Sequence, residues 1–197
     1  MVESSGLPCA VIASRSPQLP PARPYYTGAG ATHAPPDICA LVVLTAQHLA
    51  STGMILRTGV DKGADAAFAA GAGERREIYA PHTGAGGYKD GIVIGDAEVI
   101  QQAVAVAVGL HPDWRSYNDF SRRAHLRRVF QMLGKDLRTP SAFLICWAPT
   151  EDGVVEGSVR TAVALAHERA IPAYNLHELT TRTRFRERLE ELQQVHW

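Results

Sequence analysis

The loop Thr58–Asp65 contains the residue types that bind phosphate. It follows the apolar segment Met54–Leu56, contains Gly59 and Gly63, and leads into an alanine-rich segment, 64–72, with the character of a helix. A strand that ends in a glycine turn before a helix exposes backbone N–H groups and the positive end of the helix dipole. Phosphate is the common ligand of such a loop, so the sequence predicts nucleotide chemistry at this position.

Two side chains of this loop could contact a ligand directly. Lys62 could bind a phosphate group or simply remain solvated. Asp65, close to the expected helix start, could cap the helix and complement its dipole, or it could accept a hydrogen bond from a ribose hydroxyl. The residue types leave these alternatives open.

Two other glycine-containing loops also follow apolar segments. Gly28–Gly30 come after Tyr25–Thr27, and the loop 148–157 follows the continuous apolar run Phe143–Trp147. Each glycine could serve a tight turn without any ligand, but three such loops in one chain favour a shared binding site.

The helix expected after the third loop begins with polar residues that could meet an anion. Ser158 and Thr161 could cap this helix, and a cap is compatible with a bound anion. Arg160 could pair with a phosphate or extend into solvent. Trp147, at the end of the preceding strand, could stack on a base or belong to the core.

These loops need a scaffold, and strands alternate with helices along the chain. The predicted strands are 25–27, 54–58, 77–80, 143–147 and 171–174, and the predicted helices are 36–52, 64–72, 96–109, 117–134, 158–169 and 176–194. The alternation predicts an α/β fold, a Rossmann-like doubly wound and mainly parallel sheet with helices on both faces. The loops 28–34, 59–63 and 148–158 would then meet in a crevice at the carboxyl ends of the strands.

Domain organisation follows from the same pattern. Residues 1–23, rich in proline and serine, are expected to form an extended N-terminal arm, in which Cys9–Ile12 could add an edge strand. Residues 24–197 are expected to form a single domain. The arm and the amphipathic helix 176–194 both need a covering surface, which favours a homo-oligomer, a dimer or higher.

The composition and net charge of the chain limit the kinds of partner that we expect it to bind. The chain has 197 residues, of which 46% are hydrophobic, and its 20 basic and 20 acidic side chains give zero net charge. A protein that binds nucleic acid by neutralising phosphates is usually basic, so nucleic acid is not expected as a partner. No apolar run is long enough to cross a bilayer, so no membrane partner is expected either.

The cysteines indicate the cellular compartment of the protein, and the histidines indicate whether a metal is expected. Three cysteines without CxxC spacing favour a reducing cytoplasm, and the first residues lack a secretory signal. The eight histidines show no metal-ligand spacing, so neither a metal nor another cofactor is expected.

Five motifs occur in the order found in one known superfamily. They are Tyr26–Gly30 with Pro35-Pro36; Gly53–Phe68; Glu77–Pro81; His111-Pro112 with His125–Gly134; and Cys146–Pro149 with Glu156–Leu176. Over residues 25–176 the chain resembles the DprA/SMF–LOG (SLOG) superfamily, in particular its short phage and prophage DprA-like members. The resemblance implies a Rossmann-like fold that binds a nucleotide-type ligand.

The resemblance also adds an arginine to the expected site, because the family segment that matches 125–134 lies close to the pocket. We therefore expect Arg128, or its neighbour Arg127, to reach the ligand. The full set of expected ligand-binding residues is Gly28, Ala29, Gly30, Thr58, Gly59, Lys62, Gly63, Asp65, Arg128, Trp147, Gly157, Ser158, Val159, Arg160 and Thr161.

Several positions depart from the family pattern. Ala31-Thr32 replace a Ser-Arg pair, and Val60 and Glu156 each replace a glycine. The LOG branch hydrolyses nucleotide N-glycosidic bonds with a glutamate whose aligned position here is Ala164. The departures imply no catalytic residue and binding without turnover.

The expected function is therefore binding of a nucleotide or nucleotide-derived small molecule, such as an ADP-ribose-like or cyclic nucleotide signal. By analogy with the superfamily, the chain could be a phage counter-defence sponge, sequestering a signal in an anti-defence role, or a sensor. A phage-encoded chain would act in the host cytoplasm. The alternatives are a LOG-like nucleotide phosphoribohydrolase and DprA-like binding of single-stranded DNA.

Overall fold

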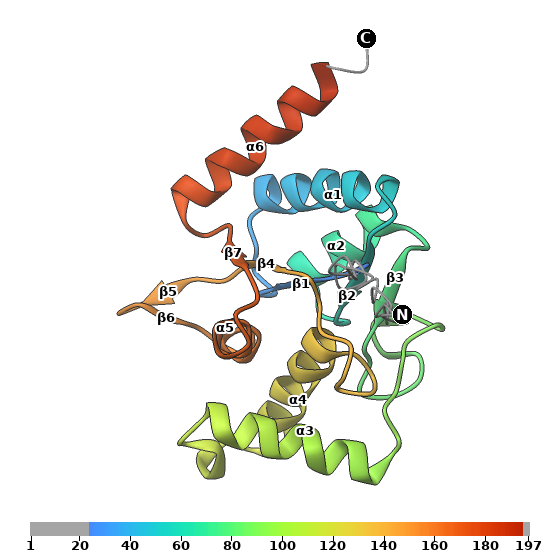
Figure 1. Ribbon diagram of the computed structural model, residues 1–197, viewed down its shortest axis with the longest axis vertical. Helices are drawn as coiled ribbons and strands as arrows, with labels where there is room; N and C mark the ends of the chain where they lie inside the picture. Colours follow the sequence, from blue (N-terminus) through green and yellow to red (C-terminus); the bar gives the residue numbers. More distant parts are fainter. Residues whose placement is uncertain (1–23, 195–197) are drawn as a thin grey trace, which may run out of the picture.

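The computed structural model describes residues 24–194, and the expected arm 1–23 with its edge strand lies outside them. Five parallel strands form the sheet, in the order β3-β2-β1-β4-β7 (Figure 1). Their bounds are β1 Tyr25–Gly30, β2 Ile55–Thr58, β3 Arg76–Ile78, β4 Leu144–Trp147 and β7 Ala173–Asn175. A short antiparallel hairpin, β5 Thr150–Glu151 and β6 Val154–Val155, follows β4.

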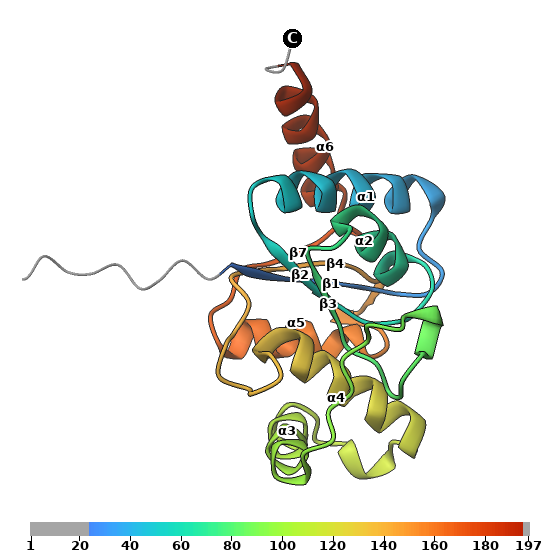
Figure 2. The ribbon, with the colours of Figure 1, turned by 90° about the vertical axis from the view of Figure 1, so that its right-hand side faces the viewer.

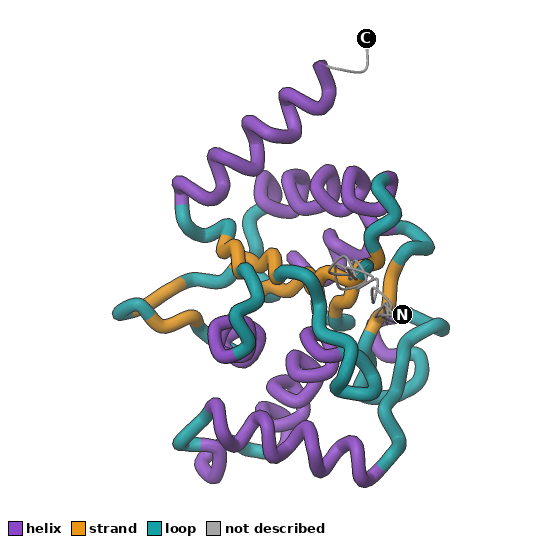
Figure 3. The backbone as a smooth tube through the Cα atoms, viewed as in Figure 1, coloured by secondary structure: helices purple, strands orange, loops and turns teal. Residues whose placement is uncertain are grey.

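Helices cover both faces of the sheet, as Figure 2 shows. On one face lie α1 Pro36–Ser51, α2 Ala64–Ala72 and α6 Leu179–Gln194; on the other lie α3 Ala97–Leu110, α4 Asp119–Leu133 and α5 Val159–Glu168. Two short 3-10 helices, η1 Ala85–Gly87 and η2 Trp114–Ser116, lie in the connections. The structure confirms the predicted α/β, Rossmann-like fold, and the tube in Figure 3 shows the same layers.

Two apolar clusters form the core, one on each face of the sheet. Along β4, Leu144 and Cys146 pack with α3, α4 and α5, whereas Ile145 and Trp147 pack with α1 and α2. Successive side chains of a strand point to opposite faces, so a continuous apolar run places residues in both layers. The apolar run 143–147 accordingly contains β4, an interior strand between β1 and β7.

Strand β1 is longer than predicted. It continues through Gly30 because Gly28 and Gly30 pair with Ile145 and Trp147 of β4, so Gly28–Gly30 are strand residues and not a loop. A side chain at Gly28 would collide with Phe68, and small residues therefore let α2 approach the sheet closely.

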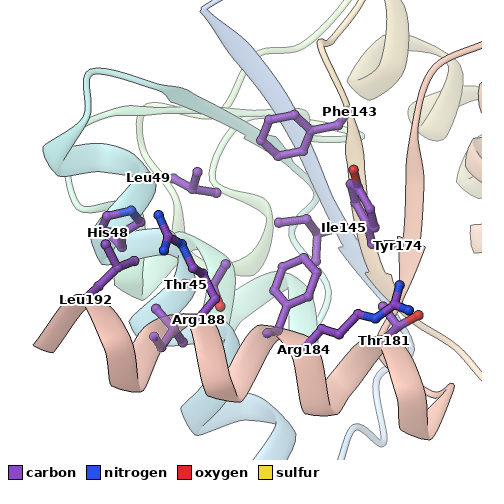
Figure 4. A pocket seen from close by; sticks show the side chains of 12 residues that line it. Thr45, His48, Leu49, Phe143, Ile145, Tyr174, Thr181, Arg184, Arg188 and Leu192 are labelled. Carbon is purple, nitrogen blue, oxygen red and sulfur yellow. The ribbon is translucent and has the colours of Figure 1, made fainter. Parts of the chain in front are cut away.

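The C-terminal helix encloses an apolar groove on the α1 face. A cavity of about 430 Å³ lies between α6, the second half of α1 and the strands β4 and β7, with Phe143, Tyr174 and Leu192 in its wall (Figure 4). Its lining includes none of the residues expected to bind ligand. The homo-oligomer expected from this helix stays a prediction. None of the helices within residues 24–194 is long and apolar enough to cross a membrane.

Candidate functional site

A pocket of about 240 Å³ lies between the loops that follow β1 and β4, and we call it the switch-point pocket. Its lining comes from four segments: Gly30, Ala31, Thr32, His33, Asp61, Arg128, Pro149, Glu156, Gly157, Ser158 and Val159. The chain leaves β1 for α1 on one face and leaves β4 for α5 on the other (Figure 2). Ligands of open parallel sheets bind where the connections diverge in this way.

A buried ion pair lies beneath this pocket. Arg128 Nη1 donates to both carboxylate oxygens of Asp65, at 3.2 and 3.0 Å, and the Gly30 N–H donates to Asp65 Oδ1 at 2.8 Å. Asp65 has no exposed surface and the Arg128 side chain is 2% exposed. Burial raises the pKa of the Asp65 carboxyl, and the Arg128 charge together with the Gly30 N–H opposes that rise.

Arg128 makes three further hydrogen bonds, one within α4 and two to other elements. Nη1 donates to Gln131 Oε1 at 2.9 Å, Nε donates to Ser158 Oγ at 3.3 Å, and Nη2 donates to the Gly30 carbonyl at 3.4 Å. The two N–H groups of Nη1 donate to Asp65 and Gln131, and the one on Nε donates to Ser158. Nη2 has two N–H groups, of which the bond to Gly30 accounts for one among the described residues, and Asp61 Oδ2 lies 3.6 Å from Nη2. Arg128 lines the pocket, yet it mainly holds β1, α2, α4 and the start of α5 together.

Asp61 is the only residue of the loop 59–63 that lines the switch-point pocket. Its carboxylate pairs with Arg127 Nη2 at 3.1 Å and lies 3.6 Å from Arg128 Nη2. Both arginines come from α4, so the charge of Asp61 is balanced inside the site.

Packing accounts for the glycines of the β2 loop. A side chain at Gly59 would collide with the Asp65 carboxylate, and one at Gly63 (φ +75°) would collide with the carbonyls of Ala31 and Thr32. These glycines therefore allow two loops and the ion pair to approach closely, a requirement that exists without any ligand.

The structure gathers five of the expected ligand-binding residues around the pocket: Gly30, Arg128, Gly157, Ser158 and Val159. The other ten do not line it: Gly28, Ala29, Thr58, Gly59, Lys62, Gly63, Asp65, Trp147, Arg160 and Thr161. Gly28, Ala29, Thr58, Gly59, Asp65 and Thr161 are buried, and Lys62 is exposed. The Asp65 carboxylate accepts from Arg128 and from the Gly30 N–H and has no exposed surface that a ribose hydroxyl could reach in this structure.

Trp147 belongs to the core, where it is 5% exposed and its ring meets the edges of His33 and His177. Asp61, His33 and Glu156 line the pocket, and none of them is among the residues expected from the sequence to bind a ligand. The one feature of the sequence that indicates these residues is their place in the glycine-containing loops. No motif around them marks them as ligand-binding residues. Ala164, aligned with the LOG glutamate, does not line the pocket.

Thr161 takes part in a buried cluster beside the pocket. Hydrogen bonds join its Oγ1 to His111 Nε2 at 2.8 Å and to His125 Nδ1 at 2.6 Å, and Tyr117 stacks on His125. A hydroxyl has one proton, so one of the two imidazoles must donate to it, an arrangement that suits two neutral rings. Within residues 24–194, no group of three His, Cys, Asp or Glu side chains could hold a metal ion.

Burial disfavours protonation of both histidines. It lowers the pKa of His125 to about 4, with further lowering by His111, Arg160 and Arg128, and it also lowers the pKa of His111, with Arg160 contributing.

Comparisons with known proteins add one distant likeness. Neither a protein-family model nor a curated protein matches the chain. Among solved structures, the chain is similar to DNA processing protein A (DprA) from Helicobacter pylori, with a TM-score of 0.36 and 14% identity, over 86% of this chain and 82% of that one. The likeness is compatible with the DprA-like resemblance drawn from the motifs, without establishing membership. It supports neither a phage nor an anti-defence role.

The expectation that nucleic acid is not a partner is wrong as an exclusion. The solved structure of DprA concerns how that protein binds single-stranded DNA, and this conflicts with the expectation. The physical reason lies in how charge is distributed, since a net charge of zero says nothing about one surface. Three arginines with exposed or partly exposed side chains, Arg122, Arg123 and Arg127, lie on the single helix α4, whereas Arg128 of the same helix is buried.

We predict that Asp65→Asn destabilises the fold by about 3–5 kcal/mol, because it leaves the Arg128 charge buried without its main partner. Urea denaturation measures the free energy of unfolding. Asp37→Asn is the matched control, since Asp37 forms an exposed pair with Arg186 at 2.8 Å and should change stability by less than about 1 kcal/mol. Equal effects of the two substitutions would contradict the assigned role.

The histidine cluster predicts a loss of stability in mild acid. The pKa of His125 is lower in the folded protein than its ordinary value of 6.5, so the unfolded chain binds the proton more readily. Stability is fully present above pH 6.5 and falls as the pH drops toward 4. For this pKa shift of the buried His125, we expect a decrease of about 2 kcal/mol between pH 7 and pH 5.

Urea denaturation across this pH range measures the effect. His125→Gln should flatten the dependence, whereas His167→Gln, which changes an exposed histidine of α5, should leave it unchanged. The same slope in all three proteins would rule out the cluster as its cause.

Proposed function

We propose that the chain binds the phosphate group of a nucleotide in the switch-point pocket, without turnover. The observation that carries this proposal is the start of α5 in the pocket wall, where Gly157, Ser158 and Val159 form one side. The first N–H groups of a helix lack intrahelical acceptors, and together with the helix dipole they favour an anion.

Hydrogen bonding at the start of α5 supports this proposal. No side chain caps the helix, because Ser158 Oγ accepts from Arg128 Nε rather than from a backbone N–H. Among the hydrogen bonds of residues 24–194, none is donated by the Ser158 N–H. A phosphate oxygen would supply the missing acceptor.

The charges in the pocket wall set a limit on affinity. Asp61 is balanced by two arginines, but the exposed Glu156 forms no ion pair among the described residues. A carboxylate close to a bound anion weakens binding. The proposal therefore relies on backbone donors more than on net positive charge.

A proline at position 158 tests the backbone donor. Ser158 has φ −68°, which proline adopts, so Ser158→Pro removes the N–H without straining that residue's backbone angle. Ser158→Ala is the matched control, because both variants lose the hydroxyl and only the first loses the N–H. Since a hydrogen bond to a charged group contributes about 1.5–3 kcal/mol, we expect Ser158→Pro to bind nucleoside monophosphates about tenfold more weakly than Ser158→Ala.

Calorimetric titration of the full chain measures these affinities, with thermal unfolding as the check on folding. Equal affinities of the two variants, or no binding by the wild-type chain, would overturn the proposal. Release of free base during incubation would replace binding by LOG-like hydrolysis.

A second candidate, binding of single-stranded nucleic acid, is favoured by one exposed aromatic residue. Phe120, in the first turn of α4, is 82% exposed. Arg123 lies about one turn further along the helix, and Arg127 about one more, where it pairs with Asp61 at the pocket. Aromatic side chains beside arginines form stacking sites for unpaired bases.

We predict that Phe120→Ala weakens binding of a single-stranded oligonucleotide by about tenfold or more, because stacking of one base contributes about 1–3 kcal/mol. Phe120→Trp should retain binding. Leu179→Ala, which removes another exposed apolar side chain, should have no effect. Fluorescence anisotropy at several salt concentrations measures the affinities, and an unchanged affinity of Phe120→Ala would argue against this candidate.

A further inference from the structure

A second pocket lies along the same edge of the sheet, and we propose that it binds the base of the nucleotide. We call it the apolar pocket; it has a volume of about 170 Å³ and walls that include Tyr79, Ile92, Ile94, Leu126 and Phe130. The inference rests on the proposed function, because it assumes a phosphate in the switch-point pocket.

The order of the strands places the two pockets in one row. Tyr79 and Ala80 follow β3, Asp61 follows β2, and the switch-point pocket follows β1 and β4. Because the strands are parallel and lie in the order β3-β2-β1-β4, all these segments share the carboxyl edge of the sheet. The β2 loop therefore lies between the two pockets.

A single ion pair separates the pockets. Arg127 lines the apolar pocket, its partner Asp61 lines the switch-point pocket, and the two groups are 3.1 Å apart. The next residue of α4, Arg128, lies beneath the switch-point pocket. A ligand that spans both pockets would pass this pair and could hydrogen-bond to either member.

The lining of the apolar pocket fits a planar heterocycle. Aliphatic and aromatic side chains form its walls. Among the residues that the structure describes, Arg123 and Arg127 are its only charged residues and no carboxylate lines it. A nucleobase has apolar faces for such walls and acceptor atoms on its edge for guanidinium donors. A phosphate could pair with the two arginines there, but it would also lie against apolar walls, and the loss of its hydration would weaken binding.

The volumes of the two pockets are consistent with a single ligand whose base lies in one pocket and whose phosphate lies in the other. Small-molecule sites usually measure about 300–1,000 Å³, and the pockets of about 170 and 240 Å³ reach this range only together. The loop that carries Ile92–Ile94 also contacts the β2 loop, because Gly86 packs against the Val60 carbonyl.

The test uses two probes with the full chain, a nucleoside monophosphate and ribose 5-phosphate, which lacks the base. Val93→Trp fills the apolar pocket from its rim, since Val93 is 42% exposed and lines it. Val108→Trp is the matched control, because Val108 is 47% exposed and lines neither pocket. Arg123→Gln removes a base donor, and Arg115→Gln removes the same charge from an exposed site outside both pockets.

We expect Val93→Trp and Arg123→Gln each to weaken nucleotide binding by about tenfold while ribose 5-phosphate binding stays within about twofold. Both controls should behave as the wild-type chain does. Equal losses for the two probes, or no loss of nucleotide binding, would overturn the base assignment while leaving phosphate binding intact. Failure of the wild-type chain to bind either probe would instead overturn the proposed function, and this inference with it.

Discussion

The buried contact between Asp65 and Arg128 is the interaction on which the carboxyl edge of this protein depends. Asp65 accepts from the Gly30 N–H, and Arg128 donates to the Gly30 carbonyl and to Ser158, so one ion pair joins β1, α2, α4 and α5. A buried charge pair is stable only when its hydrogen bonds are satisfied, which fixes the positions of all four elements. The switch-point pocket is the space that this arrangement leaves above the pair.

The same constraint changes the meaning of the glycine pattern. Gly59 lies against the Asp65 carboxylate and the Gln131 amide, and Gly30 lies against Ala64, so a larger residue at either position would displace the network. Packing alone is therefore sufficient to explain the glycines of a sequence motif that resembles a phosphate-binding loop. The ligand site that we propose is at the start of α5, where Gly157 has φ +63° and no atom lies within 4 Å of the position that a Cβ would take.

Much of the fold could be predicted from the sequence, because periodic apolar residues determine which segments are buried. The predicted helix 64–72 matches α2 at both ends, and the fold class is confirmed. Tertiary pairing was not predictable, and it extends β1 through Gly30. Nor could the sequence show that Asp65 is enclosed or that Glu156 lines the pocket, since both facts depend on residues from other segments of the chain, such as Gly30 and Arg128.

The distribution of charge along this edge determines what kind of recognition it can provide. Arg128 is committed to Asp65, and Asp61 and Glu156 place two carboxylates in the pocket wall. At the proposed site, anion binding must then come from backbone N–H groups. These donate to phosphate oxygens regardless of the base attached to the phosphate. Discrimination between nucleotides therefore requires contacts outside that pocket. We propose that the apolar pocket supplies them, since among the described residues its wall contains Arg123 and Arg127 and no opposing carboxylate.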